Sequence, residues 1–456
     1  MKKNSSTIVA QATAPGASAI SIIRISGPQA FVISKKIWQP LSKKSIKPRE
    51  LSLGWIVEGS TKLDQAMCVH MPAPHSYTAE DVVEIHSHGA PVITQKIISL
   101  ALENGASIAQ PGEFTRRAYL NGKLDLTQAE AVGELIASNN ATMLRLASKQ
   151  LAGGLSTQIK SIKSSLLDLA AHESASLDFS EEDIVDTSTL AQQTVLKKLA
   201  LQTSDLLDSS DSLAVVKNGY SIALVGLPNA GKSTLLNSLL GFDRAIVTTQ
   251  AGTTRDTITE SIVLGGVTIN ITDTAGLRDS SDKVEKIGIT RSIEELKNSD
   301  TIVVLIEPGQ SKATASYLKK NNILRFIDKK SSLVVNTKSD SKNKKDSSLE
   351  LDDITSIDLS AKTNTGLSNL KNHLQALATK NQSSENLSLL STRQLELIKK
   401  LNTQILVCID LIKAKTPPDI VLVEYQKAIS ICNSLTGESV TQEVIDKVFS
   451  DFCIGK

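Results

Sequence analysis

A glycine-rich loop is the stretch of this sequence that most directly indicates chemistry. Residues 226–233 read GLPNAGKS, which matches the phosphate-loop pattern GxxxxGKS between an apolar strand and a helix expected over residues 234–240. Glycines let backbone N–H groups curl around phosphate oxygens at the start of a helix. We expect Lys232 to reach the β and γ phosphates of a nucleoside triphosphate and the Ser233 hydroxyl to bind Mg2+.

Two later segments could sense the terminal phosphate. Residues 252–256 (GTTRD) form a switch I candidate, in which Thr254 is available as a second Mg2+ ligand. Residues 273–276 (DTAG) form a DxxG element at a strand end. There Asp273 would hold Mg2+ through water, and the N–H of Gly276 would sense the γ-phosphate.

Two further loops are suited to selecting the base. In residues 337–340 (TKSD), the Asp340 carboxylate can accept hydrogen bonds from the two N–H donors on the guanine edge, a pair that adenine lacks. Residues 360–362 (SAK) can offer a backbone N–H to the guanine carbonyl. Asparagine is usual where Thr337 stands, so we expect a weaker tie between the base and the phosphate loop, with guanine selection retained.

The residue after the DxxG element indicates an unusual route to hydrolysis. Leu277 stands where Ras-like proteins place a water-orienting glutamine, and a leucine cannot align water. Hydrolysis then needs another carboxylate or amide and another positive charge. Asn229 and residues 247–254 could coordinate a monovalent cation beside the β–γ bridging oxygen, which would supply that charge. For Asn229 alone, a role in shaping the turn is an equal alternative.

The first third of the chain has the pattern of a small α/β domain. Strand-like and turn-like segments alternate over residues 7–120, with strands expected over residues 20–25 and 82–88. Residues 91–102 have the pattern of a helix.

Long helices are expected next. Glycine and proline nearly vanish over residues 127–215, and apolar residues recur every three or four positions, which predicts a helical bundle. Thr127 and Glu130 have the spacing of a capping box that would open this stretch. The sequence becomes helical again after Ser383.

Between these helical stretches the pattern changes to alternating strands and helices. Fully apolar strands suggest a parallel sheet that is covered on both faces, and they are expected over residues 222–225, 269–273, 301–306 and 333–335. We therefore expect a Ras-like P-loop domain inserted into a helical domain, behind an N-terminal α/β domain. The expected boundaries are residues 1–122 (N-terminal domain), 123–215 (first helical part), 216–379 (G domain) and 380–456 (second helical part).

The composition is that of a soluble globular protein of several domains. The 456 residues are 40% hydrophobic and 21% charged, with a formal net charge of +2. Such a balanced surface means that any RNA must find a local patch or a partner protein. No secretory or membrane segment is recognisable, and the four cysteines show no metal-ligand spacing, which fits the cytoplasm.

The whole chain closely resembles the MnmE (TrmE) family of tRNA-modification GTPases. Its C-terminal FCIGK, at residues 452–456, is a short and specific signature of that family. The other stretches that carry the resemblance are residues 7–16, 22–27, 76–84, 111–115, 120–131, 251–256 and 273–278.

The resemblance implies a function, partners and cofactors. Members work with the FAD-dependent partner MnmG to place an aminomethyl or carboxymethylaminomethyl group on C5 of the tRNA wobble uridine. The one-carbon unit comes from 5-formyl- or 5,10-methylene-tetrahydrofolate. It also implies homodimers formed through the N-terminal domains, and G domains that approach each other when GTP and K+ are bound.

The resemblance also implies roles for individual residues. Glu285 would orient the attacking water through a second water, although on its own it would be an ordinary helix-surface charge, and Lys232 of the phosphate loop is the other catalytic residue. The implied K+ ligands are Asn229, Thr248, Gln250 (through its carbonyl) and Thr253, beside Ser233 and Thr254 for Mg2+. The residues expected around GTP are Asn229, Ala230, Gly231, Lys232, Ser233, Thr234, Thr248, Thr249, Gln250, Ala251, Gly252, Thr253, Thr254, Asp273, Thr274, Ala275, Gly276, Thr337, Lys338, Ser339, Asp340, Ser360, Ala361 and Lys362.

A folate site is implied at the N-terminal domain and the C-terminus. Its residues would be Arg24, Glu84, Lys123 and Lys456. A folate has an acidic tail that needs cations and a pterin edge that a carboxylate can bind. Taken alone, Glu84, His86 and His88 share one strand face and would suggest a metal, a polar strand face or a ligand pocket. Cys453 matches the family's terminal cysteine, and its alternatives are a catalytic thiol or an inert side chain.

One rival function comes from a different class of protein. A ribosome-assembly switch that binds rRNA would share the G domain and perform no modification. Such proteins usually append a compact basic module, whereas the appended parts here are near-neutral and helical. The sequence therefore favours tRNA modification.

Overall fold

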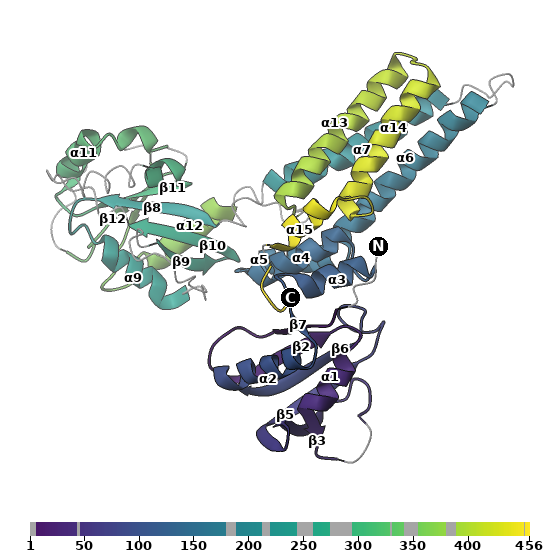
Figure 1. The fold of residues 1–456 in the computed structure, drawn as a ribbon. Coiled ribbons are helices and arrows are strands. Elements are labelled where there is room, and N and C mark those ends of the chain that lie inside the picture. Colours follow the sequence, from purple (N-terminus) through teal and green to yellow (C-terminus); the bar gives the residue numbers. More distant parts are fainter. Residues whose placement is uncertain are drawn as a thin grey trace. The chain divides into compact units, whose positions relative to one another are not determined.

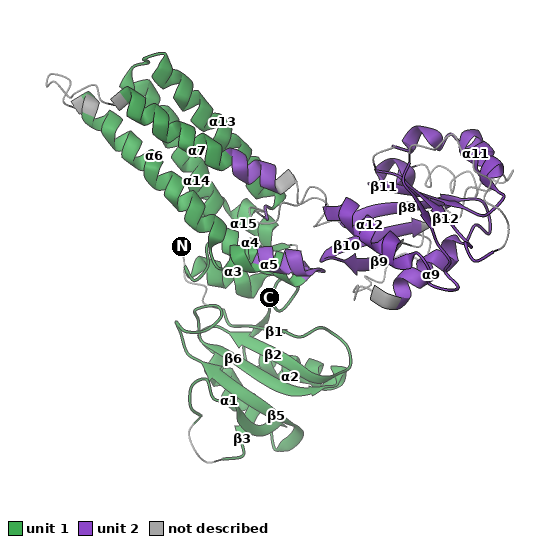
Figure 2. Cartoon of the chain, turned by 180° about the vertical axis from the view of Figure 1, so that it is seen from behind, with its two compact units in different colours: residues 1–136, 148–203, 391–456 green, residues 137–147, 204–390 purple. Residues whose placement is uncertain are grey.

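The computed structural model describes residues 6–42, 46–178, 188–211, 219–243, 259–273, 294–328, 331–341, 354–379, 389–450 and 452–456. The chain divides into two compact units, shown in green and purple in Figure 2. The first comprises residues 1–136, 148–203 and 391–456, and the second comprises residues 137–147 and 204–390. The second unit thus interrupts the sequence of the first, as expected for an inserted domain.

The first unit begins with a seven-stranded sheet in the order β3-β4-β5-β6-β2-β1-β7 (Figure 1). Neighbouring strands are antiparallel, except that β1 and β7 are parallel. The strands are β1 (Ile8–Gln11), β2 (Ser18–Ser26), β3 (Trp38–Pro40), β4 (Ser52–Glu58), β5 (Thr61–Met71), β6 (Val82–Gly89) and β7 (Ser107–Ile108).

Two helices cover one face of this sheet. They are α1 (Ala30–Ile37) and α2 (Pro91–Glu103). Ile23 of β2 and Ile85 of β6 are fully buried in the same core as Ile33 and Ile97 of these helices. Because strand side chains alternate between faces, the even-numbered neighbours on β2 and β6 lie on the opposite face, which α1 and α2 do not cover.

Four long helices follow in the first unit. They are α6 (Gly154–Asp178), α7 (Ser188–Asp211), whose last residues belong to the second unit, α13 (Thr392–Lys413) and α14 (Pro418–Thr436). The buried positions on α13 include Ile398, Leu401, Ile405 and Cys408, which is the spacing of a helix with one apolar face. Helix α14 packs against both α6 and α13. This confirms the helical domain that the residue spacing predicts.

Shorter helices complete the first unit. They are α3 (Glu113–Leu120), α4 (Leu126–Ala137), α5 (Ala141–Leu151), whose first residues belong to the second unit, and α15 (Gln442–Ser450). Leu126 and Ala129 of α4 share a buried cluster with Ile445 and Phe449 of α15. The C-terminal segment of the chain is therefore fixed to α4 by apolar packing.

The predicted capping box at Thr127 and Glu130 is wrong. Asp125 caps α4 instead, because its Oδ1 accepts from the N–H of Gln128 at 3.1 Å while Oε1 of Gln128 accepts from the N–H of Asp125 at 3.0 Å. The two candidate boxes have the same spacing, so sequence alone does not separate them. Glu130 pairs instead with Arg393, at 2.8 Å.

The second unit contains a six-stranded sheet in the order β13-β12-β11-β8-β10-β9. Neighbours are parallel except for β9 and β10. The strands are β8 (Tyr220–Gly226), β9 (Thr259–Leu264), β10 (Val267–Asp273), β11 (Thr301–Ile306), β12 (Leu333–Asn336) and β13 (Ser356–Asp358). The described helices are α9 (Lys232–Asp243), α11 (Ser311–Lys320), the short 3-10 helix η1 (Leu324–Phe326) and α12 (Leu367–Thr379), besides helical residues 294–298.

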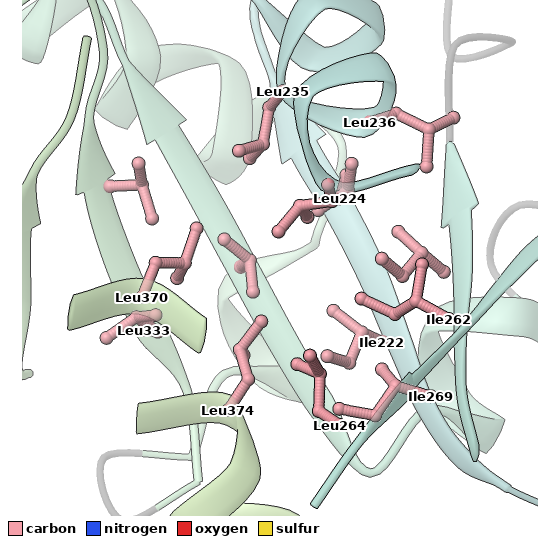
Figure 3. Packing of buried hydrophobic residues seen from close by; sticks show 14 of the residues in the cluster. Ile222, Leu224, Leu235, Leu236, Ile262, Leu264, Ile269, Leu333, Leu370 and Leu374 are labelled. Atoms are coloured by element: carbon pink, nitrogen blue, oxygen red, sulfur yellow. The ribbon is translucent and has the colours of Figure 1, made fainter. Parts of the chain in front are cut away.

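Helices cover both faces of this sheet. On one face, Leu235 of α9 and Leu370 of α12 pack against strand residues such as Ile222 (Figure 3). On the other face, Leu318 of α11 packs with Val225 and neighbouring strand residues. The predicted mostly parallel sheet with covered faces is therefore confirmed. None of the helices in the described ranges has the length and apolar character needed to span a membrane.

Candidate functional site

The phosphate loop lies between the end of β8 and the start of α9, as the motif predicts. Gly226 pairs with Leu305 of β11, and a Cβ added to it would lie 2.7 Å from the Leu305 carbonyl oxygen. Asn229 and Gly231 have positive φ angles, of 65° and 93°. Left-handed residues in such a loop turn successive N–H groups toward one side, which suits an anion. The shape role considered for Asn229 is therefore met by its backbone.

Lys232 is held over this loop by the loop's own carbonyl groups. Its ammonium donates to the carbonyl oxygens of Gly226 at 2.9 Å and Leu227 at 3.2 Å. Ser233 and Thr234 follow in the first turn of α9, where backbone N–H groups lack partners within the helix. Positive charge and N–H donors thus gather at one helix N-terminus, which is a favourable place for phosphate.

Two loops at the ends of β12 and β13 meet at Asp340. The Ser360 hydroxyl donates to Oδ1 of Asp340 at 2.7 Å, and the Ser339 N–H donates to the Leu359 carbonyl at 3.2 Å. The Ser360 hydrogen bond, with smaller help from the residue's own backbone and from Lys362, lowers the pKa of Asp340. Asp340 is therefore oriented and ionised, as a carboxylate must be to accept two N–H donors.

Thr337 joins these base-side loops to the phosphate loop. Its buried hydroxyl lies 2.9 Å from the carbonyl oxygen of Ala230 and 3.2 Å from that of Ile306. The hydroxyl thus makes the phosphate-loop half of the tie between base and phosphate loop that we expected a threonine to weaken. Lys338, with a φ of 53°, pairs with Glu307 at 2.5 Å.

Several predicted residues lie outside the described part of the chain. For Asp273 the backbone alone is described, at the end of β10. The others are Thr248, Thr249, Gln250, Ala251, Gly252, Thr253, Thr254, Thr274, Ala275, Gly276, Leu277 and Glu285.

The first unit holds a second candidate site, on the face of its sheet that is turned away from α1 and α2. Arg24 of β2 lies opposite Glu84 of β6 in the strand register, and its Nε and Nη2 each lie 2.8 Å from Oε1 of Glu84. His86 places Nε2 at 3.5 Å from the other Glu84 oxygen. His86 first, and then Arg24, lower the pKa of Glu84 against the opposing effect of burial. Arg24 and Glu84, both predicted folate residues, are thus brought together.

Aromatic rings and the C-terminus surround Arg24. Its guanidinium carbon lies 5.1 Å from the ring centre of Tyr77 and 5.5 Å from that of Phe114, close enough for cation–π attraction. Its Nη1 approaches the Gly455 carbonyl at 3.5 Å. The Phe114 N–H donates to the Lys456 carbonyl at 3.1 Å, which fixes the last residue beside this site.

Lys123 lies on the same group of loops. Its ammonium donates to the carbonyl of Ser76, the residue before Tyr77. Tyr77 and Phe114 are site residues that sequence reasoning did not select, although both fall in stretches quoted for the family resemblance. Contact between residues so far apart in the chain leaves no local signal that sequence reasoning could have used.

The histidines of β6 do not form a metal centre. His88 turns to Asp64, whose carboxylate accepts from the His88 backbone at 3.0 Å and lies 2.6 Å from Nδ1. Among the described residues, no group of three or more His, Cys, Asp or Glu side chains could hold a metal ion. Cys453 is exposed near the chain end, where its carbonyl accepts from the Gly112 N–H at 3.4 Å.

Comparison with known proteins gives this architecture a family. Residues 7–123 match the model described as "GTP-binding protein TrmE N-terminus", and residues 126–453 match the model described as "MnmE helical domain". A tRNA modification GTPase MnmE from Flavobacterium psychrophilum is 37% identical over 461 residues, covering 99% of each chain. The chain belongs to the MnmE family of tRNA modification GTPases.

A second relative agrees with this assignment. A tRNA modification GTPase MnmE from Thermotoga petrophila is 34% identical and covers 99% of this chain and 100% of its own length. Among solved structures, the G domain of the FeoB iron transporter from T. maritima is 21% identical, with a TM-score of 0.25, and covers 36% of this chain and 99% of its own. Membership of the MnmE family makes the chain a GTPase of tRNA modification.

Proposed function

We propose that this MnmE family member hydrolyses GTP with K+ stimulation and uses that cycle to modify the wobble uridine of certain tRNAs at C5. It acts in the cytoplasm as a homodimer, together with an FAD-dependent MnmG-type partner. The product is an aminomethyl or carboxymethylaminomethyl group built from a tetrahydrofolate one-carbon unit. The observation that carries the GTP-dependent part of the proposal is the Thr337–Ala230 contact, which joins the phosphate loop to the segment that bears Asp340.

In the nucleotide site, each described residue has a proposed part. The loop amides and Lys232 bind the phosphates, and Asp340 accepts from the guanine N–H edge while the SAK loop meets the carbonyl. Ser233 and Asn229 carry oxygen donors of the hard type that Mg2+ and K+ prefer, so they fit as ligands. When bound, these cations supply the positive charge that offsets the charge developing on the transferred phosphoryl group.

Part of the proposed machinery lies outside the described residues. Thr254 would complete the Mg2+ site, and Asp273 and Gly276 would sense the γ-phosphate. Thr248, Gln250 and Thr253 would complete the K+ site, and Glu285 would orient the attacking water. The roles of Thr254, Asp273 and Gly276 come from the switch I and DxxG motifs, the others come from the family resemblance, and all remain proposals.

In the first unit, Arg24, Glu84, Lys123 and Lys456 form the proposed folate site. The donor set fits because Glu84 is an ionised carboxylate suited to a pterin edge, whereas Arg24 and the lysines are cations suited to an acidic tail. The half-buried ring of Tyr77 offers a flat apolar surface beside Arg24, whereas Phe114 is fully buried and contacts Arg24 from within the core. Cys453 keeps both of its alternatives, a catalytic thiol or an inert one.

GTP turnover in KCl and in NaCl tests the cation-dependent part of this proposal. We expect turnover at least about tenfold faster in KCl, because a cation at the β–γ bridge would supply the positive charge that an arginine finger supplies in other GTPases. Lys232→Ala should remove nucleotide binding in both salts. Equal turnover in the two salts would contradict the K+ mechanism while leaving GTP hydrolysis intact.

The tRNA-modifying role needs a separate experiment. Mass spectrometry of tRNA nucleosides from a strain lacking this gene should show unmodified wobble uridines, and complementation with the intact chain should restore them. Complementation with Arg24→Gln, which keeps a polar N–H donor but shortens the side chain and removes its charge, should fail. Unchanged wobble uridines in the deletion strain would favour the rival ribosome-assembly function.

A further inference from the structure

A single buried hydroxyl connects the two halves of the nucleotide site. Thr337 is 3% exposed, and its Oγ1 lies 2.9 Å from the Ala230 carbonyl oxygen and 3.2 Å from that of Ile306. Carbonyl oxygens only accept hydrogen bonds, and a threonine hydroxyl carries one proton. The proton therefore serves one of these carbonyls at a time, and the shorter distance favours Ala230.

A guanine base presents donors and acceptors on different edges. Its N1–H and N2–H2 groups donate, whereas O6 and N7 accept. Asp340, held by Ser360 at 2.7 Å, is an acceptor and suits only the donor edge. The ribose is attached at N9, and in the usual anti conformation the C8–N7 side of the base lies toward the 5′ phosphates, whereas N1 and N2 lie on the far edge. Thr337 lies on that side, because its hydroxyl reaches the phosphate loop.

We propose that Thr337 is a positioning residue that directs its only proton to the phosphate loop and offers none to N7 of guanine. The inference rests on the proposed GTP site and specifies how that site selects its base. The site then distinguishes guanine from other bases through N1, N2 and O6, the atoms that Asp340 and the SAK loop would contact. Loss of the N7 acceptor should then cost this site little affinity.

An asparagine at position 337 would behave differently. A side-chain amide carries two protons, so it can donate to the Ala230 carbonyl and keep a second proton for N7. Thr337→Asn should therefore add recognition of N7. Thr337→Val, which keeps the shape and removes the hydroxyl, should weaken binding of every nucleotide without changing the preference at N7.

Binding of GTP, 7-deaza-GTP and ITP to the intact chain tests this inference. For the unaltered protein we expect 7-deaza-GTP to bind within about twofold of GTP. For Thr337→Asn we expect a preference for GTP of about fivefold, the effect of one added hydrogen bond. Because ITP lacks the N2 amine that Asp340 reads, it should bind at least about tenfold more weakly to every variant.

The outcomes separate this inference from the function on which it rests. If the unaltered protein binds 7-deaza-GTP fivefold or more weakly than GTP, N7 is read and the inference is wrong, whereas the guanine site stands. If GTP itself does not bind in the presence of Mg2+, both are wrong. The comparison within the unaltered protein decides the matter even if a variant fails to fold.

Discussion

At the scale of single residues, Arg117 ties three segments of the first unit together. Its side chain is 1% exposed, and it reaches Glu80 at 3.0 Å and Glu113 at 2.8 Å. It also donates to the Ser6 carbonyl at 2.8 Å. Glu80 in turn accepts from the Ser26 hydroxyl of β2 at 2.8 Å. These bonds hold the loop that carries Tyr77 and thus the surroundings of Arg24.

Arg117→Met should destabilise the first unit by about 3–5 kcal/mol, because it leaves two carboxylates without their buried partner. Urea unfolding followed by circular dichroism measures the loss. Lys96→Met is the matched control, since Lys96 pairs with Glu58 on the exposed surface. A midpoint for Arg117→Met as high as that of the control would show that the buried pairs contribute no stability.

His70 gives the first unit a dependence on pH. Burial first, and then the charge of Lys35, lower its pKa, with Asp81 acting in the opposite direction. The ring stacks on Phe31 at 4.7 Å, and its Nε2 lies 3.0 Å from the Ser34 hydroxyl. The folded state therefore favours the neutral ring.

The sign of the resulting pH effect follows directly. In the unfolded chain His70 has a pKa of about 6.5, and in the folded chain its pKa is lower. As pH falls below about 6.5, the unfolded chain therefore takes up a proton more readily than the folded chain, and the free energy of unfolding decreases. The slope is at most about 1.4 kcal/mol per pH unit. Comparing urea unfolding of the unaltered chain and of His70→Gln at pH 7.5 and 5.5 checks this. The variant should lose less stability over that interval, and an equal loss would exclude His70 as the cause.

Single residues also show how much of the candidate sites can be predicted from the sequence. Asp340 and Lys232 could be assigned from local motifs, because loop chemistry depends on residues a few positions apart. The partners Tyr77, Phe114 and Arg24 come together only through strand pairing and the docked C-terminus, which leave no local pattern. The choice of Asp125 over Thr127 as helix cap was equally hidden, since both have the required spacing.

At the scale of elements, Glu130 of α4 fixes the start of α13. Arg393 donates to both Glu130 oxygens, through Nε at 2.9 Å and Nη2 at 2.8 Å, and the Ser391 hydroxyl donates at 3.0 Å. Ser391 is also the N-cap of α13, in a capping box with Gln394. The Glu130 carboxylate thus accepts hydrogen bonds from the first residues of α13, at the point where the chain returns to the first unit. Periodicity predicted the helices themselves but not this junction.

Glu130→Gln should cost about 3 kcal/mol of stability, because the bidentate pair with Arg393 cannot form with an amide. A double-mutant cycle with Arg393→Met isolates the coupling. The expected coupling energy is at least about 1 kcal/mol, as for residues that share one hydrogen-bond network. Additive losses in the double variant would mean that the pair acts independently.

At the scale of the whole molecule, each unit has its own hydrophobic core. The described core of the second unit is built from its sheet together with α9, α11 and α12. The clusters of the first unit involve its own sheet and helices. The apolar runs of the inserted sheet made its fold predictable. Short strands such as β1 and β7 contain too few residues to show the alternation of apolar and polar positions that identifies a strand. Separate cores mean that ligand binding to one unit need not stabilise the other.

GDP should therefore raise the midpoint temperature of one unfolding transition, measured by calorimetry, and leave that of the other transition unchanged. A ligand that binds only the folded state stabilises it by about 2.7 kcal/mol at a concentration of one hundred times its Kd. The nucleotide residues that are described all belong to the second unit, so its transition is the one that should move. Lys232→Ala should remove the increase that GDP causes. Arg117→Met should lower only the midpoint temperature of the first unit's transition, because Arg117 lies in that unit. If GDP raised both transitions equally, the two cores would have to unfold as one cooperative body, and the independence inferred from their packing would be wrong.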